Sequence, residues 1–229
     1  AKASLLKDLN FTVQALLAVV DDVLDVAKIE AGKLRLHEEG FNIRDWLQRS
    51  MAIFSANMQR KDIDFTHSVA GDVPELLIGD AARIQQILIN FLSNAYKFTN
   101  RGGMVHVGIT GCKAEERFLL RICVEDDGAG MDPQKLKEIA ISRGVLDEDA
   151  AARMTDTEAY NLIFEPGFST AEKVTNISGR GVGLDVVRKE IEKLNGSVTV
   201  HSSLGEGSKF VIKLPLTLAI IQGLLVRVG

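Results

Sequence analysis

The chain has 229 residues, of which 46% are hydrophobic and 25% are charged, and its net charge is −4 with a pI near 5.7. This composition is typical of a globular protein with one substantial core. It lacks the basic excess of a nucleic-acid-binding surface, and aromatic residues, at 6%, are too few for a base-stacking platform. No signal peptide or bilayer-length apolar run is present, so we expect a soluble, cytoplasmic protein without direct membrane insertion.

The two cysteines, Cys112 and Cys123, have neither CxxC spacing nor a neighbouring histidine cluster. Both fall in strand-like stretches. A reducing compartment with two buried thiols is therefore favoured over a disulfide.

Residues 1–38 have the pattern of one long helix. Apolar residues recur alternately three and four positions apart, as in a heptad seam: Leu6, Leu9, Val13, Leu16, Val20, Val23 and Ala27. Such a helix has to bury its stripe against another helix, and the chain offers no antiparallel partner of matching length. We expect a dimerisation helix that joins a helical bundle in a homodimer, or that packs on a segment preceding residue 1. Packing on the chain's own domain is the alternative.

Residues 39–215 alternate helical and strand patterns, which predicts an α+β fold. The expected form is a two-layer sandwich, with a mixed sheet covered by helices on one face. The predicted elements are, in order, a helix from its N-cap Asn42 to about Arg60, a strand within 62–69, a helix with Asp80 as N-cap, strands at 103–112 and 117–127, a mostly helical stretch from Pro133 to about Ile163, a helix at 184–194, and a hairpin of 196–203 with 207–215.

The helical stretch "ILINFLSNAYKFTN", residues 87–100, is apolar except for a line of polar side chains. Asn90, Asn94 and Lys97 are spaced i, i+4 and i+7, which puts them on one face of the helix. The spacing predicts that this face meets a polar ligand while the other faces serve the core.

Three glycine-containing stretches follow. In "VEDDGAGM" a strand ends in two carboxylates, and Gly128 and Gly130 then allow a ligand to approach the backbone closely. An acidic side chain there can accept a hydrogen bond from an exocyclic amine. Alone, the stretch is also ordinary turn chemistry.

The second stretch, "SGRGVGLDVV" at 178–187, is a glycine-rich loop that runs into a helix. Free N–H groups and the helix dipole make such a helix start an anion site, although a flexible loop is the plainer interpretation. No Gly-Lys-Ser/Thr closes the loop as in a Walker motif, and no βαβ crossover surrounds it as in a Rossmann fold. The third stretch, "GEGS" at 205–208, reads alone as a hairpin turn.

Taken together and in this order, the four stretches resemble the ATP-binding domain of the superfamily that contains gyrase, heat-shock chaperones, histidine kinases and MutL-type repair proteins. The resemblance covers about residues 40–215 and implies ATP and Mg²⁺ as cofactors. It implies that Asn94 coordinates Mg²⁺ with support from Asn90, that Lys97 contacts phosphate and that Asp126 accepts from the adenine amino group. It also implies further nucleotide contacts from Gly128 and Gly130, from the loop residues Gly179, Arg180, Gly181, Val182, Gly183 and Leu184, and from Ser208.

Within this superfamily, the residue one helical turn before the metal-binding Asn distinguishes enzymes that hydrolyse ATP from those that transfer phosphate to histidine. Hydrolysing members carry a Glu there as general base, whereas this chain has Asn90, and an amide cannot take up a proton at neutral pH. Histidine kinases carry Asn and deliver phosphate to an imidazole. The resemblance therefore implies a protein-histidine kinase of two-component signalling. The alternatives are a dimeric ATP-binding scaffold without kinase activity and an ATPase.

Two kinase branches are represented along the chain. The stretches at 22–47 and 91–103 resemble a sensor or hybrid histidine kinase, whereas the chain from Asp126 onward resembles the chemotaxis histidine kinase, with Phe164 and Phe168 as its phenylalanine box. Residues 216–229 resemble the truncated start of a regulatory domain that couples to receptors, so receptor-coupling proteins are implied partners. A natural mosaic and a joined pair of kinase types both fit this pattern.

A histidine kinase needs a phosphoacceptor, and this chain has only four histidines. None of them lies in a Ser-His-Glu-Leu-Arg-like stretch on a dimerisation helix: they are His37, His67, His106 and His201. We therefore expect a kinase core that acts on a histidine in another domain or segment and, beyond it, serves a response regulator.

Overall fold

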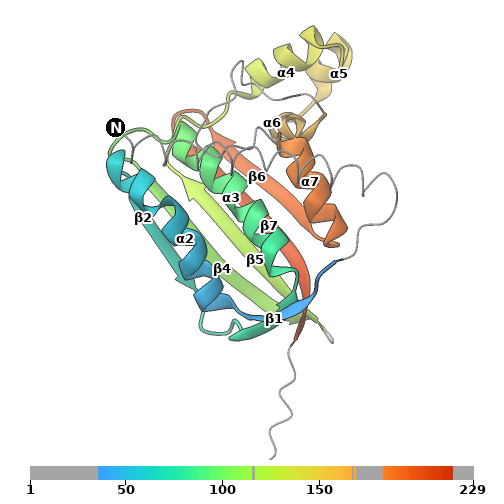
Figure 1. The fold of residues 1–229 in the computed structure, drawn as a ribbon. Coiled ribbons are helices and arrows are strands. Elements are labelled where there is room, and N and C mark those ends of the chain that lie inside the picture. Colours follow the sequence, from blue (N-terminus) through green and yellow to red (C-terminus); the bar gives the residue numbers. More distant parts are fainter. Residues whose placement is uncertain (1–35, 115–116, 167, 169–182, 219–229) are drawn as a thin grey trace, which may run out of the picture.

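The computed structural model describes residues 36–114, 117–166, 168 and 183–218 (Figure 1). Residues 1–35 of the predicted dimerisation helix, the loop residues Gly179–Val182 and most of the predicted C-terminal segment lie outside these ranges. The division of the chain at residues 38 and 215 stays a prediction.

The first two helices begin at the predicted caps. Helix α2 (Ile43–Arg60) follows Asn42, whose side-chain oxygen accepts hydrogen bonds from the backbone N–H groups of Arg44 and Asp45. Helix α3 (Ala81–Phe98) follows Asp80, which accepts from the N–H of Arg83. Each cap satisfies donors that a helix start leaves without an intrahelical partner.

One mixed sheet forms the second layer. Its strands are β1 (Glu39–Asn42), β2 (Asp64–Val69), β3 (Leu76–Gly79), β4 (Met104–Ala114), β5 (Arg117–Asp126), β6 (Ser197–Ser203) and β7 (Gly207–Leu218). The order is β1-β3-β7-β5-β4-β2, and β6 pairs with β7. Only the β2–β4 pair is parallel among these strands. The sequence pattern predicted neither β1 nor β3 as a strand.

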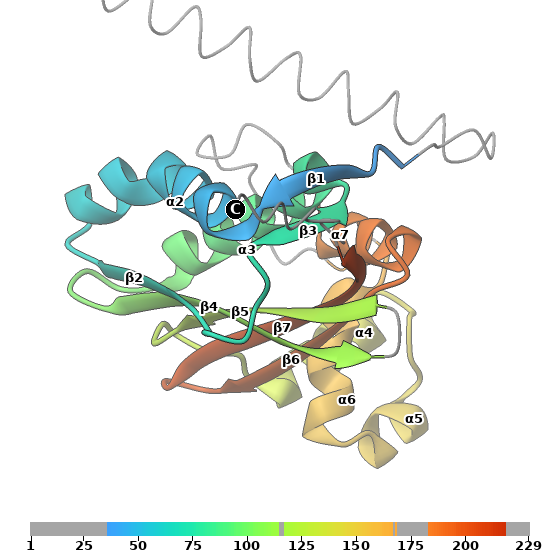
Figure 2. The same ribbon diagram turned by 90° about the horizontal axis from the view of Figure 1, so that it is seen from below.

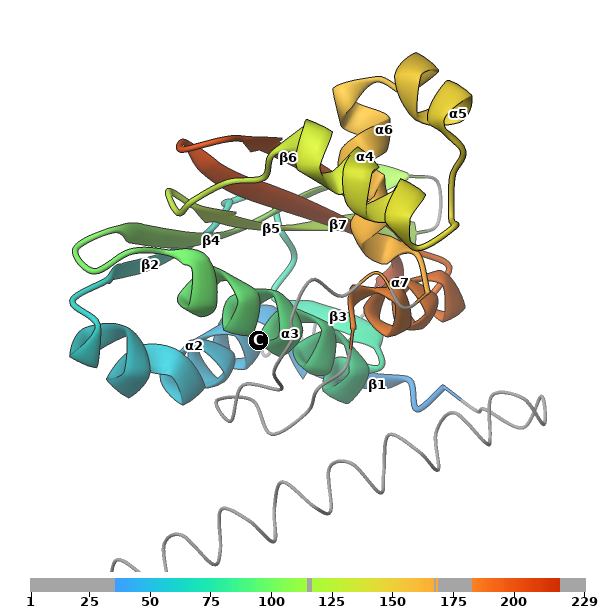
Figure 3. The same cartoon turned by 90° about the horizontal axis from the view of Figure 1, so that it is seen from above.

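Helices α2, α3 and α7 (Leu184–Lys193) cover one face of the sheet (Figure 2; Figure 3). The central strands alternate as a sheet with one covered face requires: in β5, Phe118, Leu120, Ile122 and Val124 are buried and join the core. The predicted two-layer α+β sandwich is confirmed by this arrangement.

The predicted helical stretch after Pro133 is also confirmed, as several short elements. They are α4 (Pro133–Ser142), α5 (Glu148–Arg153), α6 (Asp156–Asn161) and the 3₁₀ turn η1 (Leu162–Phe164). Separate side-chain caps at Asp132, Asp147 and Thr155 start a new helix each time, so the stretch folds as a compact unit. Helix α6 packs beside the edge strand β6, and η1 packs beside α7.

The cysteine prediction was partly wrong. Both thiols are free and lie in strands, but Cys112 is exposed near the end of β4, and Cys123 is only partly buried. Both belong to the strand positions that alternate with the core residues, so none of the helices in the described ranges covers them. Burial still raises the pKa of the Cys123 thiol, against the opposing effect of Lys209. None of the helices among the described residues is long and apolar enough to cross a membrane.

Thr99, directly after α3, is 1% exposed, and its hydroxyl has no hydrogen-bond partner in the part of the chain described. A buried polar group without a partner lowers stability. We therefore expect Thr99→Val to raise the free energy of unfolding by about 1 kcal/mol. Denaturant unfolding measures this effect, with Thr110→Val on the exposed side of β4 as control. A destabilised Thr99→Val would contradict the prediction and indicate that an ordered water binds the hydroxyl.

Candidate functional site

The polar line of α3 continues one face of the helix. Arg83, Ile87, Asn90, Asn94 and Lys97 follow one another three or four residues apart. Asn90 is 8% exposed, and Asn94 and Lys97 are partly buried. Neither asparagine amide hydrogen-bonds to another described residue. Both amides are therefore available to a ligand.

A buried carboxylate lies at the end of β5. Asp126 is 7% exposed, and its Oδ1 accepts a hydrogen bond from the Gly128 N–H at 3.0 Å. Burial raises the pKa of Asp126, while hydrogen bonds from the backbone of Gly128 and Ser208 oppose the shift. A carboxylate held in this way can accept one more hydrogen bond from a ligand amine with high selectivity, because water does not compete freely there.

The turn after Asp126 packs too tightly for any residue but glycine at two positions. A Cβ on Gly128 would lie 2.6 Å from the carbonyl oxygen of Phe98. Gly130 has a φ of +63°, and a Cβ there would lie 1.9 Å from the carbonyl oxygen of Ser203. The turn therefore lies against both the end of α3 and the β6–β7 hairpin, which brings Asp126 close to the polar line.

Backbone hydrogen bonds fix the same arrangement. The Ala129 N–H donates to the Phe98 carbonyl at 3.3 Å, and the Gly205 N–H donates to the Ala129 carbonyl at 2.8 Å. Three stretches predicted from sequence thus meet at this turn, namely the α3 helix, the Asp-x-Gly-x-Gly turn and the last hairpin.

Ser208 lies directly across the sheet from Asp126, since the two residues pair in the β5–β7 register. The Ser208 hydroxyl lies 3.0 Å from the Ser202 hydroxyl. The Ser202 hydroxyl also donates to the Gly207 carbonyl and accepts from the Met131 N–H. Ser202 therefore ties the hairpin to the glycine turn. No sequence pattern predicts this role, because a lone serine in a strand pattern has no distinguishing spacing.

Phe98 is a second residue that the sequence analysis missed. Its ring is 47% exposed, although it ends an otherwise apolar helix, and the Lys97 ammonium lies 4.8 Å from the ring centroid. The backbone carbonyl of Phe98 contacts the glycine turn, so Phe98 carries an exposed aromatic ring at the end of α3 that adjoins this turn. In the sequence, only its position next to Lys97 indicated that Phe98 could belong to the site.

Phe164 and Phe168 are 3% and 2% exposed and belong to the core beside α4 and α7. The guanidinium of Arg143 lies 5.7 Å from the ring of Phe168, and that of Arg188 lies 6.0 Å from the ring of Phe164. Their rings therefore support neighbouring elements, and direct nucleotide contact by either ring stays a prediction.

The amino end of α7 is the described part of the predicted anion site. Gly183 is its N-cap and supplies no side-chain hydrogen bond to the first turn, which begins at Leu184. The first N–H groups of this helix thus have no capping side chain and can receive a phosphate oxygen.

The donor set of the site suits Mg²⁺ held together with phosphates. Among the residues described, no group of three or more His, Cys, Asp or Glu side chains could hold a metal ion. Mg²⁺ prefers oxygen ligands and is often bound through few protein groups plus substrate phosphates and water. The amide oxygens of Asn90 and Asn94 fit that pattern, since they make no bond within the described protein.

A helix-covered mixed sheet with an amide pair on α3 and a buried carboxylate beside a glycine turn is the arrangement expected of an ATP-binding catalytic domain. The family described as "Histidine kinase-, DNA gyrase B-, and HSP90-like ATPase" matches residues 79–218, and the chain belongs to that family.

Relatives come from both kinase branches. The chain is 41% identical over 187 residues to a chemotaxis protein CheA from Borreliella burgdorferi, which covers 82% of this chain and 21% of that protein. It is 35% identical over 201 residues to the sensor protein GacS of Pseudomonas syringae pv. syringae, covering 88% of this chain and 20% of that protein. A CheA of Treponema pallidum is 56% identical over 116 residues, or 51% of this chain and 14% of that protein. The chain thus spans between 14% and 21% of the length of these relatives.

Solved structures show the same fold. Full-length ShkA in complex with AMPPNP superposes with a TM-score of 0.64 at 28% identity, over 89% of this chain and 36% of that one. The catalytic domain of histidine kinase ThkA superposes with a TM-score of 0.55 at 22% identity, over 80% of this chain and 96% of that one, and this likeness concerns the fold alone. The expected membership of the histidine kinase type, with features of chemotaxis and sensor kinases, is confirmed.

Proposed function

We propose that this chain is the ATP-binding catalytic core of a protein-histidine kinase. It binds Mg-ATP and transfers the γ-phosphoryl group to a histidine supplied by another domain or segment. The activity of a whole kinase, its acceptor and its response regulator belong to this proposal, because the chain spans only a small part of its relatives.

The observation that carries the proposal is the chemistry of α3. This helix contains no Asp, Glu or His. The residue one helical turn before Asn94, the metal-binding candidate, is Asn90, whose side chain is an amide. Activation of water needs a group that accepts its proton, and an amide cannot do so at neutral pH. A neutral imidazole is already a nucleophile and needs less help. The helix therefore favours transfer to histidine over hydrolysis.

The roles of the chain's own residues follow from their positions. Asp126 accepts from the adenine amino group, and the exposed ring of Phe98 forms an apolar wall beside the base. Asn90 and Asn94 present amide oxygens to Mg²⁺, which neutralises phosphate charge when bound. Lys97 and the amino end of α7 act on the phosphates. Catalysis then comes from positioning and charge neutralisation, as in other phosphoryl transfers.

The acceptor histidine comes from outside the described domain in this proposal. His37 is exposed before β1, and His67, His106 and His201 are in strands. Both ring nitrogens of His106 face hydroxyls, with Thr66 at 2.9 Å and Ser68 at 3.1 Å. We therefore assign none of the four as acceptor. Homodimerisation through residues 1–38, coupling to receptors through residues 216–229 and a cytoplasmic location are part of the same proposal.

Phosphotransfer tests the proposal directly. Purified chain is mixed with radiolabelled ATP, Mg²⁺ and a separate histidine-bearing acceptor domain, and acid-labile label on that domain is measured. A CheA-type phosphotransfer domain and a sensor-kinase helical hairpin are used in parallel. Nucleotide binding without transfer to either acceptor would contradict the kinase assignment and favour the scaffold alternative.

The ATPase alternative predicts a different result. Fast, steady phosphate release without an acceptor, unaffected by Asn90→Ala, would show that water is activated without this position and would contradict the argument from α3. Slow background release that does not compete with transfer agrees with a kinase.

A further inference from the structure

We propose that Arg83 and Glu190 are positioning residues for phosphoryl transfer. Their ion pair holds α7 against α3, and it does so away from the proposed phosphate site. This inference deepens the proposed function and rests on it for its activity readout. Neither residue is among the predicted nucleotide contacts.

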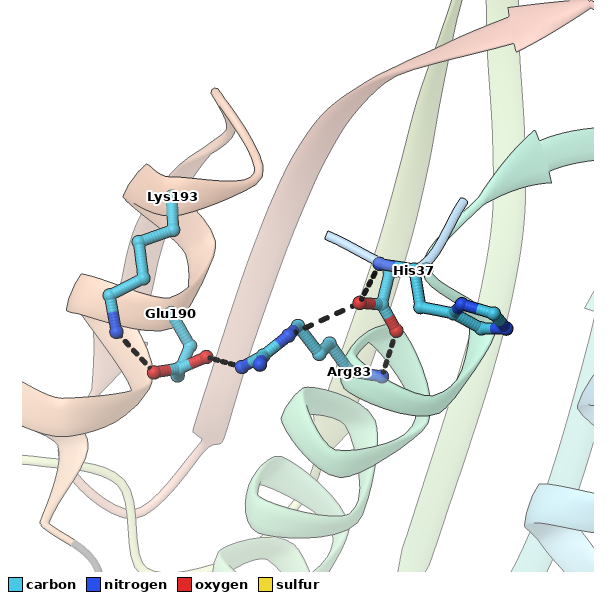
Figure 4. Close-up of polar contacts among 5 residues, drawn as sticks. His37, Arg83, Glu190 and Lys193 are labelled. Atoms are coloured by element: carbon cyan, nitrogen blue, oxygen red, sulfur yellow. Dashed lines mark hydrogen bonds and ion pairs between the residues drawn. The ribbon is translucent and has the colours of Figure 1, made fainter. Parts of the chain in front are cut away.

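The pair belongs to a chain of charges shown in Figure 4. Arg83 Nη1 lies 2.8 Å from Glu190 Oε2, and both side chains are mostly buried, at 19% and 16% exposure. Lys193 Nζ lies 2.5 Å from Glu190 Oε1, so each carboxylate oxygen of Glu190 has a cationic partner. Ion pairs at this depth are screened less by solvent than surface pairs, and they hold a defined geometry.

Asp80 orients the arginine from the other side. Its carboxylate is 4% exposed and lies 3.1 Å from Arg83 Nε, and it also accepts from the Arg83 N–H. A third donor is the N–H of His37, at 3.1 Å. Asp80 therefore fixes the guanidinium and, with it, the point at which the chain enters the domain before β1.

The location of this bridge explains why it bears on the site. Arg83 lies on the same face of α3 as Asn90 and Asn94, about 10 Å before Asn90 along the helix axis. Glu190 lies about 10 Å after Gly183 along α7. The two helices run in opposite directions in Figure 1, so the bridge joins the start of α3 to the end of α7.

The groups proposed to act on metal and phosphate lie further along α3 and at the start of α7. The amide pair is on α3, and the uncapped N–H groups begin α7. A change at the bridge therefore alters the separation between the groups that bind the metal and the groups that bind phosphate. A misplacement of about 1 Å at a reacting group can cost about 100-fold in rate.

The test compares Glu190→Gln with Glu192→Gln in the full chain. Both substitutions remove one carboxylate from α7, but Glu192 pairs with Arg188 on the exposed surface. We expect Glu190→Gln to lower the phosphotransfer rate at saturating Mg-ATP about tenfold, with a smaller change in KM, and Glu192→Gln to change it less than about twofold. Arg83→Lys, which keeps the charge, should retain more of the rate than Arg83→Gln.

Hydrogen exchange gives a readout that does not need transfer. With a Mg-ATP analogue bound, the first-turn amides of α7 should exchange faster in Glu190→Gln than in Glu192→Gln. A rate and an exchange pattern equal to those of the control, with only a lower melting temperature, would show that the pair is merely structural and overturn the inference. If even the unaltered chain transfers no phosphate, the proposed function fails while the exchange comparison still decides the role of the bridge.

Discussion

Asn94→Ala is expected to abolish the Mg²⁺-dependent part of ATP affinity and to reduce phosphotransfer by about 100-fold or more. The reason is that the amide oxygen of Asn94, which makes no bond within the described protein, is the group that we propose to meet the metal and its phosphates. Affinity is measured by titration with nucleotide in Mg²⁺ and in chelator. The unaltered chain should bind more tightly in Mg²⁺, and the variant should not distinguish the two conditions.

The free energy of unfolding should not fall together with the nucleotide affinity. Alanine is a better helix former than asparagine by about 0.7 kcal/mol or less, and removal of this amide breaks no hydrogen bond in the described structure. We therefore expect Asn94→Ala to leave the free energy of unfolding unchanged or slightly higher. Loss of function without loss of stability is the expected sign of a residue selected for ligand contact.

Asn161→Ala is the matched control, because it removes an amide from the end of α6, where it bonds to the Thr157 carbonyl. It should leave affinity and transfer within about twofold and lower stability slightly. Unchanged Mg²⁺-dependent affinity in Asn94→Ala would refute the metal assignment.

Local signals were sufficient for the parts of the fold in which neighbours along the chain decide the structure. Asn42 and Asp80 were recognisable as caps because a cap bonds to N–H groups two or three residues on. The polar face of α3 was recognisable because helical periodicity relates Asn90 to Asn94 without further information.

Contacts between distant residues were not accessible in this way. β3 is a strand because Leu77 pairs with Leu218 on one side and with Phe41 on the other, and its own four residues carry no alternation. The Arg83–Glu190 pair spans 107 positions. The Ser202 hydroxyl meets the Met131 N–H across 71 positions. No spacing rule relates such residues, so only the assembled sheet reveals them.

Asp126→Asn is expected to weaken ATP binding about tenfold or more and to blur the preference for ATP over GTP. A hydrogen bond to a charged acceptor is worth about 1.5–3 kcal/mol, and about 1.4 kcal/mol corresponds to a tenfold change in affinity. Asparagine keeps an oxygen that can accept from the Gly128 N–H, so the turn should be retained. What is lost is the negative charge facing the amine, and the new NH₂ group can face the carbonyl of guanine.

The same substitution should have a pH-dependent effect on stability, with a sign that follows from burial. The pKa of Asp126 is raised in the folded chain, mainly because burial disfavours the charged form. Folding therefore favours the protonated carboxyl. Its contribution to stability is complete below the ordinary carboxyl pKa of about 3.9 and is lost as pH rises through the raised value. The free energy of unfolding of Asp126→Asn, relative to the unaltered chain, should thus increase as pH rises across that interval.

Asp127→Asn separates the loss of adenine recognition from a general loss of charge. Asp127 is exposed, and its Oδ1 also accepts from a backbone N–H, that of Met104 at 2.7 Å, so the substitution preserves an equivalent bond. Nucleotide-free denaturant unfolding from pH 4 to pH 7 measures the increase for Asp126→Asn, and titration with ATP and GTP should show lost discrimination for Asp126→Asn but not for Asp127→Asn. If Asp126→Asn discriminates ATP from GTP as well as the unaltered chain does, the adenine contact lies elsewhere. If it is less stable at pH 7, the carboxylate is held by contacts that outweigh its burial.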